Sequence, residues 1–194
     1  MAKRILKRGF TLVELMIVVA IIGVLAALAI YGVRKYLNNA KTAEAREALG
    51  RIEKDASGAY NRENMAATVL DLGGVAGVSN RLCASATATV PSTKDKIAGQ
   101  KYQSSPSEWN AGSQVDGWQC LKFTMQEPQY FMYKYEATTP TATDGSFVAS
   151  AFGDLNGDGN TSTFAMGGAL KRDAAGGGIA LTIAPTIAET NPDE

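Results

Sequence analysis

A continuous apolar run near the N-terminus dominates the hydropathy pattern of this 194-residue chain. It extends over residues 10–33, and Glu14 is its only charged residue. Residues 15–33 are 19 consecutive uncharged residues, which as a helix span roughly 28 Å, about one hydrocarbon core. This length favours a membrane-spanning helix over the buried helix of a globular domain.

The residues that flank the apolar run predict its orientation. Four cations precede the run, namely Lys3, Arg4, Lys7 and Arg8, whereas Arg34 and Lys35 follow it. Because cations concentrate on the cytoplasmic side, we expect the N-terminus in the cytoplasm and the C-terminal part exported. An ordinary secretory signal has its small-residue cleavage site after the apolar segment, whereas Gly9 lies before it. Cleavage at Gly9 would therefore leave the apolar segment on the mature chain.

Beyond the apolar run, the pattern becomes that of an amphipathic helix. Apolar side chains recur three and four positions apart, at Ala45, Ala48, Leu49, Ile52, Ala56, Ala59 and Tyr60. A single helix from about Phe10 to Tyr60 would be roughly 75 Å long. We expect its first half to be apolar all round and its second half to pack one face on a sheet.

Short strand patterns occupy the C-terminal half of the chain. They follow an irregular connector over residues 61–115, in which a short helix near 65–72 is the one regular element we expect. The strand patterns lie at residues 119–125, 130–137, 146–152 and 161–166. Turn-length gaps between them predict an antiparallel meander. The fold class is therefore α+β, a long N-terminal α-helix packed on a small antiparallel β-sheet of about four strands.

Composition narrows the function classes. The formal charge is zero, with 19 cations and 19 anions, and removal of residues 1–9 would leave 15 cations and a net charge of −4. That charge argues against nucleic-acid binding as the main function. The chain has no histidine, which excludes Ser-His-Asp and Cys-His catalysis and the usual His-containing zinc sites. We do not expect an enzyme.

The two cysteines of the chain, Cys83 and Cys120, both lie in the part that we expect to be exported. In that oxidising compartment they predict one disulfide, and the alternative is two free buried thiols. A disulfide would connect the irregular connector to the first predicted strand.

The turn before the last predicted strand has the spacing of a calcium-binding loop. Asp154, Asn156 and Asp158 place side-chain oxygens at alternate positions, as in the first half of an EF-hand, and Asn160 would add a backbone carbonyl. The twelfth position is Ala165 instead of the bidentate glutamate. The segment is therefore either a turn alone, in which Asn-Gly and Asp-Gly tolerate positive φ, or a turn with a weak calcium site.

The segment GFTLVELMIVVAIIGVLAALAI, residues 9–30, closely resembles the start of a type IV pilin precursor. The resemblance implies that prepilin peptidase cleaves between Gly9 and Phe10 and then N-methylates Phe10. It also implies that Glu14 balances the terminal amine of a neighbouring subunit during assembly. The family often has proline directly after this stretch, whereas this chain has Tyr31-Gly32 there. A glycine weakens a helix by only about 1 kcal/mol relative to alanine, so local melting would have to start from glycine.

Glu14 has a second interpretation, which depends on local structure alone. Thr11 and Glu14 fit a capping box, in which Glu14 reaches back to the amide of Thr11 at the start of a helix. The two interpretations are compatible, because capping in the precursor and charge pairing in a fibre occur at different stages.

The resemblance implies three segments: a leader peptide over 1–9, a membrane-spanning and fibre-core helix over 10–33, and an exported head over 34–194 that includes the amphipathic half of the helix. It implies a pilus subunit for adhesion, surface motility or DNA uptake, held in the inner membrane as a precursor and then extracellular. Its partners would be prepilin peptidase, the assembly platform of the inner membrane, the membrane and copies of itself. The alternatives are a type II secretion pseudopilin and an uncleaved single-span protein with an exported binding domain.

Overall fold

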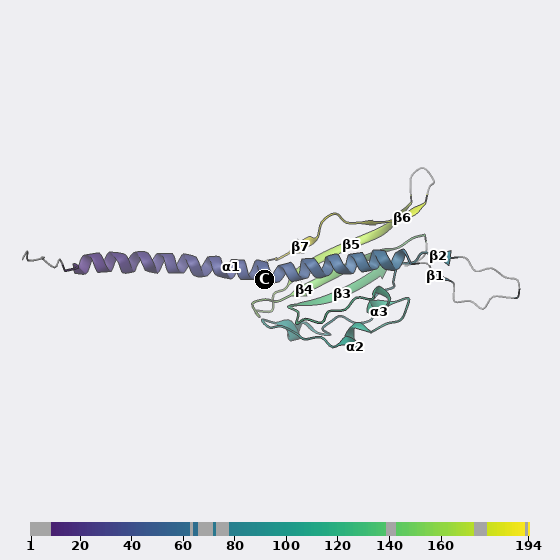
Figure 1. The fold of residues 1–194 in the computed structure, drawn as a ribbon, viewed down its shortest axis with the longest axis horizontal. Helices are drawn as coiled ribbons and strands as arrows, with labels where there is room; N and C mark the ends of the chain where they lie inside the picture. Colours follow the sequence, from purple (N-terminus) through teal and green to yellow (C-terminus); the bar gives the residue numbers. More distant parts are fainter. Residues whose placement is uncertain are drawn as a thin grey trace, which may run out of the picture. The chain divides into compact units, whose positions relative to one another are not determined.

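The computed structural model describes residues 9–62, 64–65, 72, 78–138, 143–172, 178–192 and 194. The chain divides into two compact units, Met1–Asn39 and Ala40–Glu194. The helix α1 (Leu12–Tyr60) contributes its first 28 residues to the first unit and the remainder to the second (Figure 1). We call the second unit the head. The helix predicted over residues 10–60 is confirmed, and it continues without interruption through Gly32.

The part of α1 that belongs to the first unit leaves its apolar side chains uncovered. Leu, Ile, Val and Ala fill these turns, and every residue from Gly9 to Leu37 is exposed. Gly23 and Gly32 both have open space around the position of a Cβ atom. Helical propensity and backbone hydrogen bonds therefore hold this part of the helix, without tertiary packing in the single chain.

In the head, residues 40–60 of α1 bury one face, and Figure 1 shows this part of the helix running along the sheet. Half of the buried residues of this face are alanines. Its buried residues are Thr42, Ala45, Ala48, Leu49, Ile52, Ala56, Ala59 and Tyr60. All seven apolar positions expected from the sequence are among them, so the amphipathic half of the prediction is confirmed.

The sheet of the head has five antiparallel strands, one more than the approximate number expected. They are β3 (Phe131–Thr138), β4 (Ser146–Gly153), β5 (Ser162–Arg172), β6 (Ile179–Ile183) and β7 (Ala188–Thr190). The order is β3-β4-β5-β6, a meander as predicted, and β7 pairs with the start of β5. The predictions at 130–137, 146–152 and 161–166 are confirmed as β3, β4 and the first part of β5. β6 and β7 were not expected.

The strand predicted at residues 119–125 is wrong. The segment instead begins in the short helix α3 (Gly117–Leu121) and continues as extended chain outside the sheet. Gly117 has φ of 69° and Lys122 has φ of 61°, so left-handed residues bound the helix at both ends. The Thr124 carbonyl accepts a hydrogen bond from the Arg51 side chain at 2.9 Å, where a strand would bond to a neighbouring strand.

The connector before α3 contains short elements. β1 (Asn64–Met65) pairs with β2 (Val78–Ser79), and η1 (Lys94–Ile97) and α2 (Pro106–Trp109) follow. The short helix expected near 65–72 falls almost wholly outside the described residues. The connector runs beside β3, because Val90 exchanges backbone hydrogen bonds with Tyr133 and the amide of Ala86 donates to Tyr135.

A disulfide joins Cys83 to Cys120, with their Cα atoms 5.8 Å apart. Both cysteines belong to the buried core. The bridge connects the irregular connector to α3, and not to a strand as the sequence suggested. Beside the bridge, Ala84 exchanges backbone hydrogen bonds with Val115 and Gly117, so the two segments are joined by both the disulfide and a short stretch of pairing.

Glu44 attaches the amphipathic half of α1 to the start of β3. Its carboxylate accepts hydrogen bonds from the backbone N–H of Tyr130 at 2.7 Å and from the hydroxyl of Tyr133 at 3.4 Å. Burial raises the pKa of Glu44 above its ordinary value, although these hydrogen bonds and the charge of Lys101 oppose the shift. The folded chain therefore takes up a proton at Glu44 at a higher pH than the unfolded chain does.

We predict that Glu44→Gln flattens the pH dependence of stability. The contribution of Glu44 makes the wild-type chain less stable as pH rises through the raised folded-state pKa, because the charged form must then be buried. Glutamine carries no charge and keeps an oxygen that accepts from Tyr130. Urea midpoints of the detergent-solubilised chain from pH 4 to pH 8 measure the effect. Glu53→Gln, on the same helix, is the matched control, and parallel curves for wild type and Glu44→Gln contradict the prediction.

We predict that Cys120→Ser destabilises the head by roughly 3–4 kcal/mol, the chain-entropy value for a bridge across this separation. The two cysteines are 37 residues apart in the sequence. Limited proteolysis and denaturant unfolding of the full chain measure the effect, with cleavage expected first in the connector. Two reactive thiols in the wild-type chain would show that the bridge does not form.

Candidate functional site: the N-terminal segment

The start of α1 is capped by its own side chains. The backbone N–H of Thr11 donates to Oε2 of Glu14 at 2.9 Å, and the backbone N–H of Glu14 donates to Oγ1 of Thr11 at 3.2 Å. The Thr11 hydroxyl also donates to Oε2 of Glu14, at 2.8 Å. This reciprocal pair is the capping box expected from the sequence, and it satisfies two donors that a helix start otherwise leaves unpaired.

The Gly9–Phe10 peptide bond lies just before this cap and outside the helix. Phe10 is 87% exposed, and a Cβ atom on Gly9 would have no heavy atom within 4 Å beyond its chain neighbours. A protease needs a peptide bond that is uncovered and outside regular structure. The local structure therefore leaves this bond accessible while the following residues are already helical.

The apolar half of α1 forms a large exposed apolar surface. From Leu12 to Leu37, seventeen large apolar side chains are at least half exposed. The most apolar 18-residue stretch has a mean hydropathy of 2.9 and no buried residue, so α1 is long and apolar enough to cross a membrane. Soluble monomers rarely leave such a surface uncovered, and a lipid bilayer or other apolar helices are the environments that suit it.

Comparison with known proteins agrees with this geometry. Residues 5–30 match the family described as the prokaryotic N-terminal methylation motif. A fimbrial protein of Moraxella nonliquefaciens is 54% identical over 39 residues. The chain therefore carries the N-terminal methylation motif and is similar over a short stretch to a fimbrial protein. Gly9, Phe10 and Glu14, the three residues that the resemblance singled out, all lie within the matched range.

The likeness that these comparisons find covers a small part of the chain. The aligned residues are 20% of this chain and span about a quarter, 25%, of the Moraxella fimbrial protein. No solved structure matches the chain. The role of the head therefore has to be inferred from its own residues. The remaining candidate sites lie in the head.

The loop between β4 and β5 contains the residues expected to bind calcium. Both oxygens of the Asp154 carboxylate accept backbone amides, from Gly157 at 2.7 Å and from Gly159 at 3.1 Å. Oδ1 of Asn156 accepts the amide of Asp158 at 2.9 Å, and Oδ1 of Asp158 accepts that of Asn160 at 2.8 Å. The hydrogen bonds from the backbone and the side chain of Asn160 lower the pKa of Asp158, and the side chain of Asn156 acts in the same direction.

The loop thus uses its side-chain oxygens to hold its own backbone. Gly157 and Gly159 have φ of 78° and 91°, as the turn interpretation requires. Within the described residues no group of three His, Cys, Asp or Glu side chains is placed to hold a metal ion, so a calcium ion would also need the amide oxygen of Asn156 and backbone carbonyls. Calcium binding stays a prediction.

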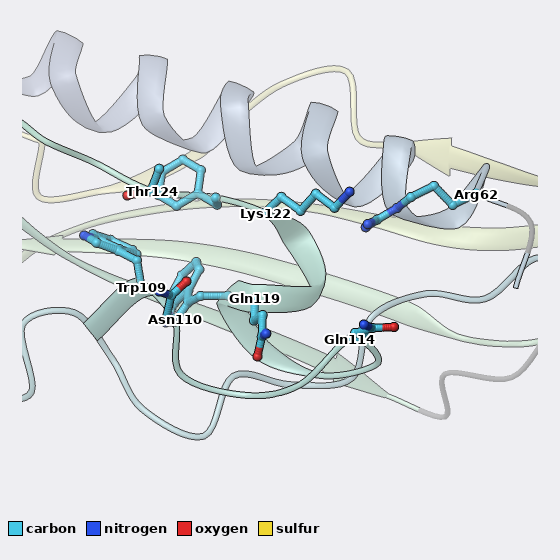
Figure 2. A pocket seen from close by; sticks show the side chains of 9 residues that line it. Arg62, Trp109, Asn110, Gln114, Gln119, Lys122 and Thr124 are labelled. Atoms are coloured by element: carbon cyan, nitrogen blue, oxygen red, sulfur yellow. The ribbon is translucent and has the colours of Figure 1, made fainter. Parts of the chain in front are cut away.

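Sequence reasoning missed a hollow of about 600 Å³ in the head, which Figure 2 shows from close by. It is lined by residues of α2 and α3, by the segments that follow them and by Arg62, just beyond the end of α1. The signal in the sequence was faint: the two tryptophans of the chain, Trp109 and Trp118, both line it. No spacing rule would have brought them together, because they are contributed by two separate short helices.

We predict that EDTA lowers the melting temperature of the detergent-solubilised chain if calcium holds the β4–β5 loop. Asp158→Ala should abolish this response, because it removes a charged ligand at the centre of the loop. The response to EDTA, measured by circular dichroism, is compared within each variant, since the substitution also removes two hydrogen bonds that Asn160 donates to Asp158. An unchanged melting temperature of the wild-type chain would leave the segment as a turn alone.

Proposed function

We propose that this chain is the structural subunit of a type IV pilus. It is made as a precursor held in the inner membrane, cut between Gly9 and Phe10 by prepilin peptidase, methylated on Phe10, and polymerised through the apolar half of α1. The observation that carries the proposal is the exposed apolar helix with a single carboxylate, Glu14, five residues beyond Gly9, within a matched N-terminal methylation motif.

The exposed helix has to stay out of water both before and after assembly. Each large apolar side chain that becomes buried between subunits contributes on the order of 1.5–3 kcal/mol relative to water. In the membrane the same surface is already in an apolar medium, so transfer into a fibre core exchanges lipid contacts for helix contacts. A subunit can therefore be held in the bilayer and then enter a fibre without exposing this apolar surface to water.

The capping box leaves Glu14 able to bind a second partner. Its hydrogen bonds to Thr11 both use Oε2, and in the described part of the chain Oε1 accepts none. Cleavage after Gly9 would convert the amide of Phe10 into a terminal amine, but the N–H of Thr11 would stay an amide. The cap would thus survive processing while Oε1 stays open to the methylated amine of a neighbouring subunit.

The proposal assigns the chain a structural role and makes it the substrate of an enzyme. Its partners are prepilin peptidase, the assembly platform of the inner membrane, the membrane before assembly and copies of itself in an extracellular filament. Adhesion and surface motility are the roles that fit best. DNA uptake is not favoured by the net charge of −4 after removal of residues 1–9.

We predict that Gly9→Val blocks processing, because a branched side chain at the cut hinders approach of the peptidase to the backbone. The expected result is a full-length precursor in the inner membrane and no sheared fibres. Gly23→Val, at a helical glycine that also has open space around it, is the matched control and should be processed normally. N-terminal sequencing measures whether each variant is cleaved. A wild-type chain that begins at Met1 would favour an uncleaved single-span protein.

Glu14→Ala is the companion variant in the same experiment. It removes a charge that costs about 2.5–3.5 kcal/mol on insertion scales, so membrane insertion and cleavage should proceed. Fibres should not form, because the amine of Phe10 loses its partner. Thr11→Ala keeps the carboxylate and should still assemble. Equal polymerisation of Glu14→Ala and wild type would leave capping as the whole role of Glu14, and an absence of long wild-type fibres would favour a pseudopilin.

A further inference from the structure

The base of the hollow in the head is a rigid aromatic cluster. The Trp109 ring lies edge-to-face against Trp118 and Phe123, with centroids 5.1 and 5.2 Å apart. The three residues are at most 2% exposed. The indole N–H groups donate to the Ser104 hydroxyl and the Ala88 carbonyl, which fixes both tryptophans. The base is therefore held in one conformation without a ligand.

The sides of the hollow present carboxamides. Asn110, Gln114 and Gln119 line it, all three are exposed, and their side chains form no hydrogen bond within the described residues. Figure 2 shows Gln119 and Gln114 on the same side of the hollow, below Lys122 in that view. A carboxamide both donates and accepts hydrogen bonds, and it therefore pairs best with a group that also does both.

Two cations complete the lining, and none of the residues that line the hollow is acidic. Figure 2 shows the side chains of Lys122 and Arg62 directed towards one another. The Arg62 guanidinium donates to the carbonyl of Cys120, and Asp55 lies within its electrostatic reach. Lys122 forms no ion pair in the part of the chain that the structure describes, and its left-handed backbone, which ends α3, sets the origin of its side chain.

We propose that this hollow binds a carboxylated saccharide, with the carboxylate at Lys122 and Arg62 and the hydroxyls at the three carboxamides. A volume of about 600 Å³ suits a short oligosaccharide and lies within the usual range of small-molecule pockets. The proposal rests on the pilus assignment in one respect only, namely that the ligand would be bound outside the cell.

The carboxamides favour a saccharide over a phosphodiester backbone. A sugar hydroxyl donates to an amide oxygen and accepts from an amide nitrogen, so it satisfies both ends of Asn110, Gln114 or Gln119. A phosphodiester only accepts, and would leave the three amide oxygens without donors. The net charge of −4 that we expect for the processed chain also opposes long-range attraction of a highly charged polyanion.

Intrinsic fluorescence offers a direct test, because the two tryptophans of the chain both line the hollow. The detergent-solubilised full chain is titrated with a trisaccharide of galacturonic acid, with the matched trisaccharide of galactose, with inorganic phosphate and with a short single-stranded DNA. We expect a saturable change in tryptophan emission with the acidic trisaccharide, binding at least about tenfold weaker with the neutral one, and no saturable change with the other two.

Lys122→Gln should weaken binding of the acidic trisaccharide by about tenfold, the size of one charge-assisted hydrogen bond, and leave the neutral one unaffected. Gln119→Ala should weaken both. Lys94→Gln removes the same charge from η1, outside the hollow, and should change neither. Far-UV circular dichroism and an intact disulfide establish that each variant is folded.

The proposal is overturned if the acidic trisaccharide gives no saturable change, or if Lys122→Gln binds it as well as wild type. A saturable response of equal strength to phosphate or to DNA would also overturn it, and would identify an unselective anion site. Because the titration needs no fibres, failure of polymerisation and failure of saccharide binding are separate results.

Discussion

The helix α1 has to fit two environments, one outside the chain and one against the sheet, and the rest of the structure follows from this constraint. The first part of α1 is apolar on every face and is covered by nothing in the single chain. The second part is apolar on one face and is covered by the sheet. The sheet, the connector and the disulfide all belong to the head, together with the second part of the helix. The first part is left for a medium or a partner outside the chain, and a single carboxylate in such an apolar medium is costly.

Periodicity predicted the elements that have a simple period. The helix was found almost to the residue, because its two patterns, all-apolar and then amphipathic, join without a break. β3, β4 and the start of β5 alternate or are rich in aromatic and β-branched residues. β6 and β7 escaped, because β6 is short and only half-buried and β7 is exposed throughout. Their pairing with β5 comes from tertiary contact, and their own sequences carry little sign of it.

Residues 119–125 show why alternation alone can mislead. Leu121, Phe123 and Met125 are indeed buried, with exposed residues between them, as in a strand. The backbone of this segment bonds to side chains instead of a neighbouring strand: the Thr124 carbonyl accepts from Arg51 and the Met125 carbonyl from the Ser104 hydroxyl. The same limit applies to the sites. Gly9, Phe10 and Glu14 form a linear motif and could be recognised in sequence, whereas the hollow is assembled from segments that only folding brings together.

The alanine face of α1 has a consequence for how the two parts of the helix tolerate change. Ala45, Ala48, Ala56 and Ala59 are at most 2% exposed, so a larger side chain at any of these positions would have to displace its neighbours in the core of the head. In the first part, Leu, Ile, Val and Met could replace one another without any loss of packing within the subunit. In the fibre that we propose, random mutation of the chain would be selected by folding in the head and by the fit between subunits in the apolar part.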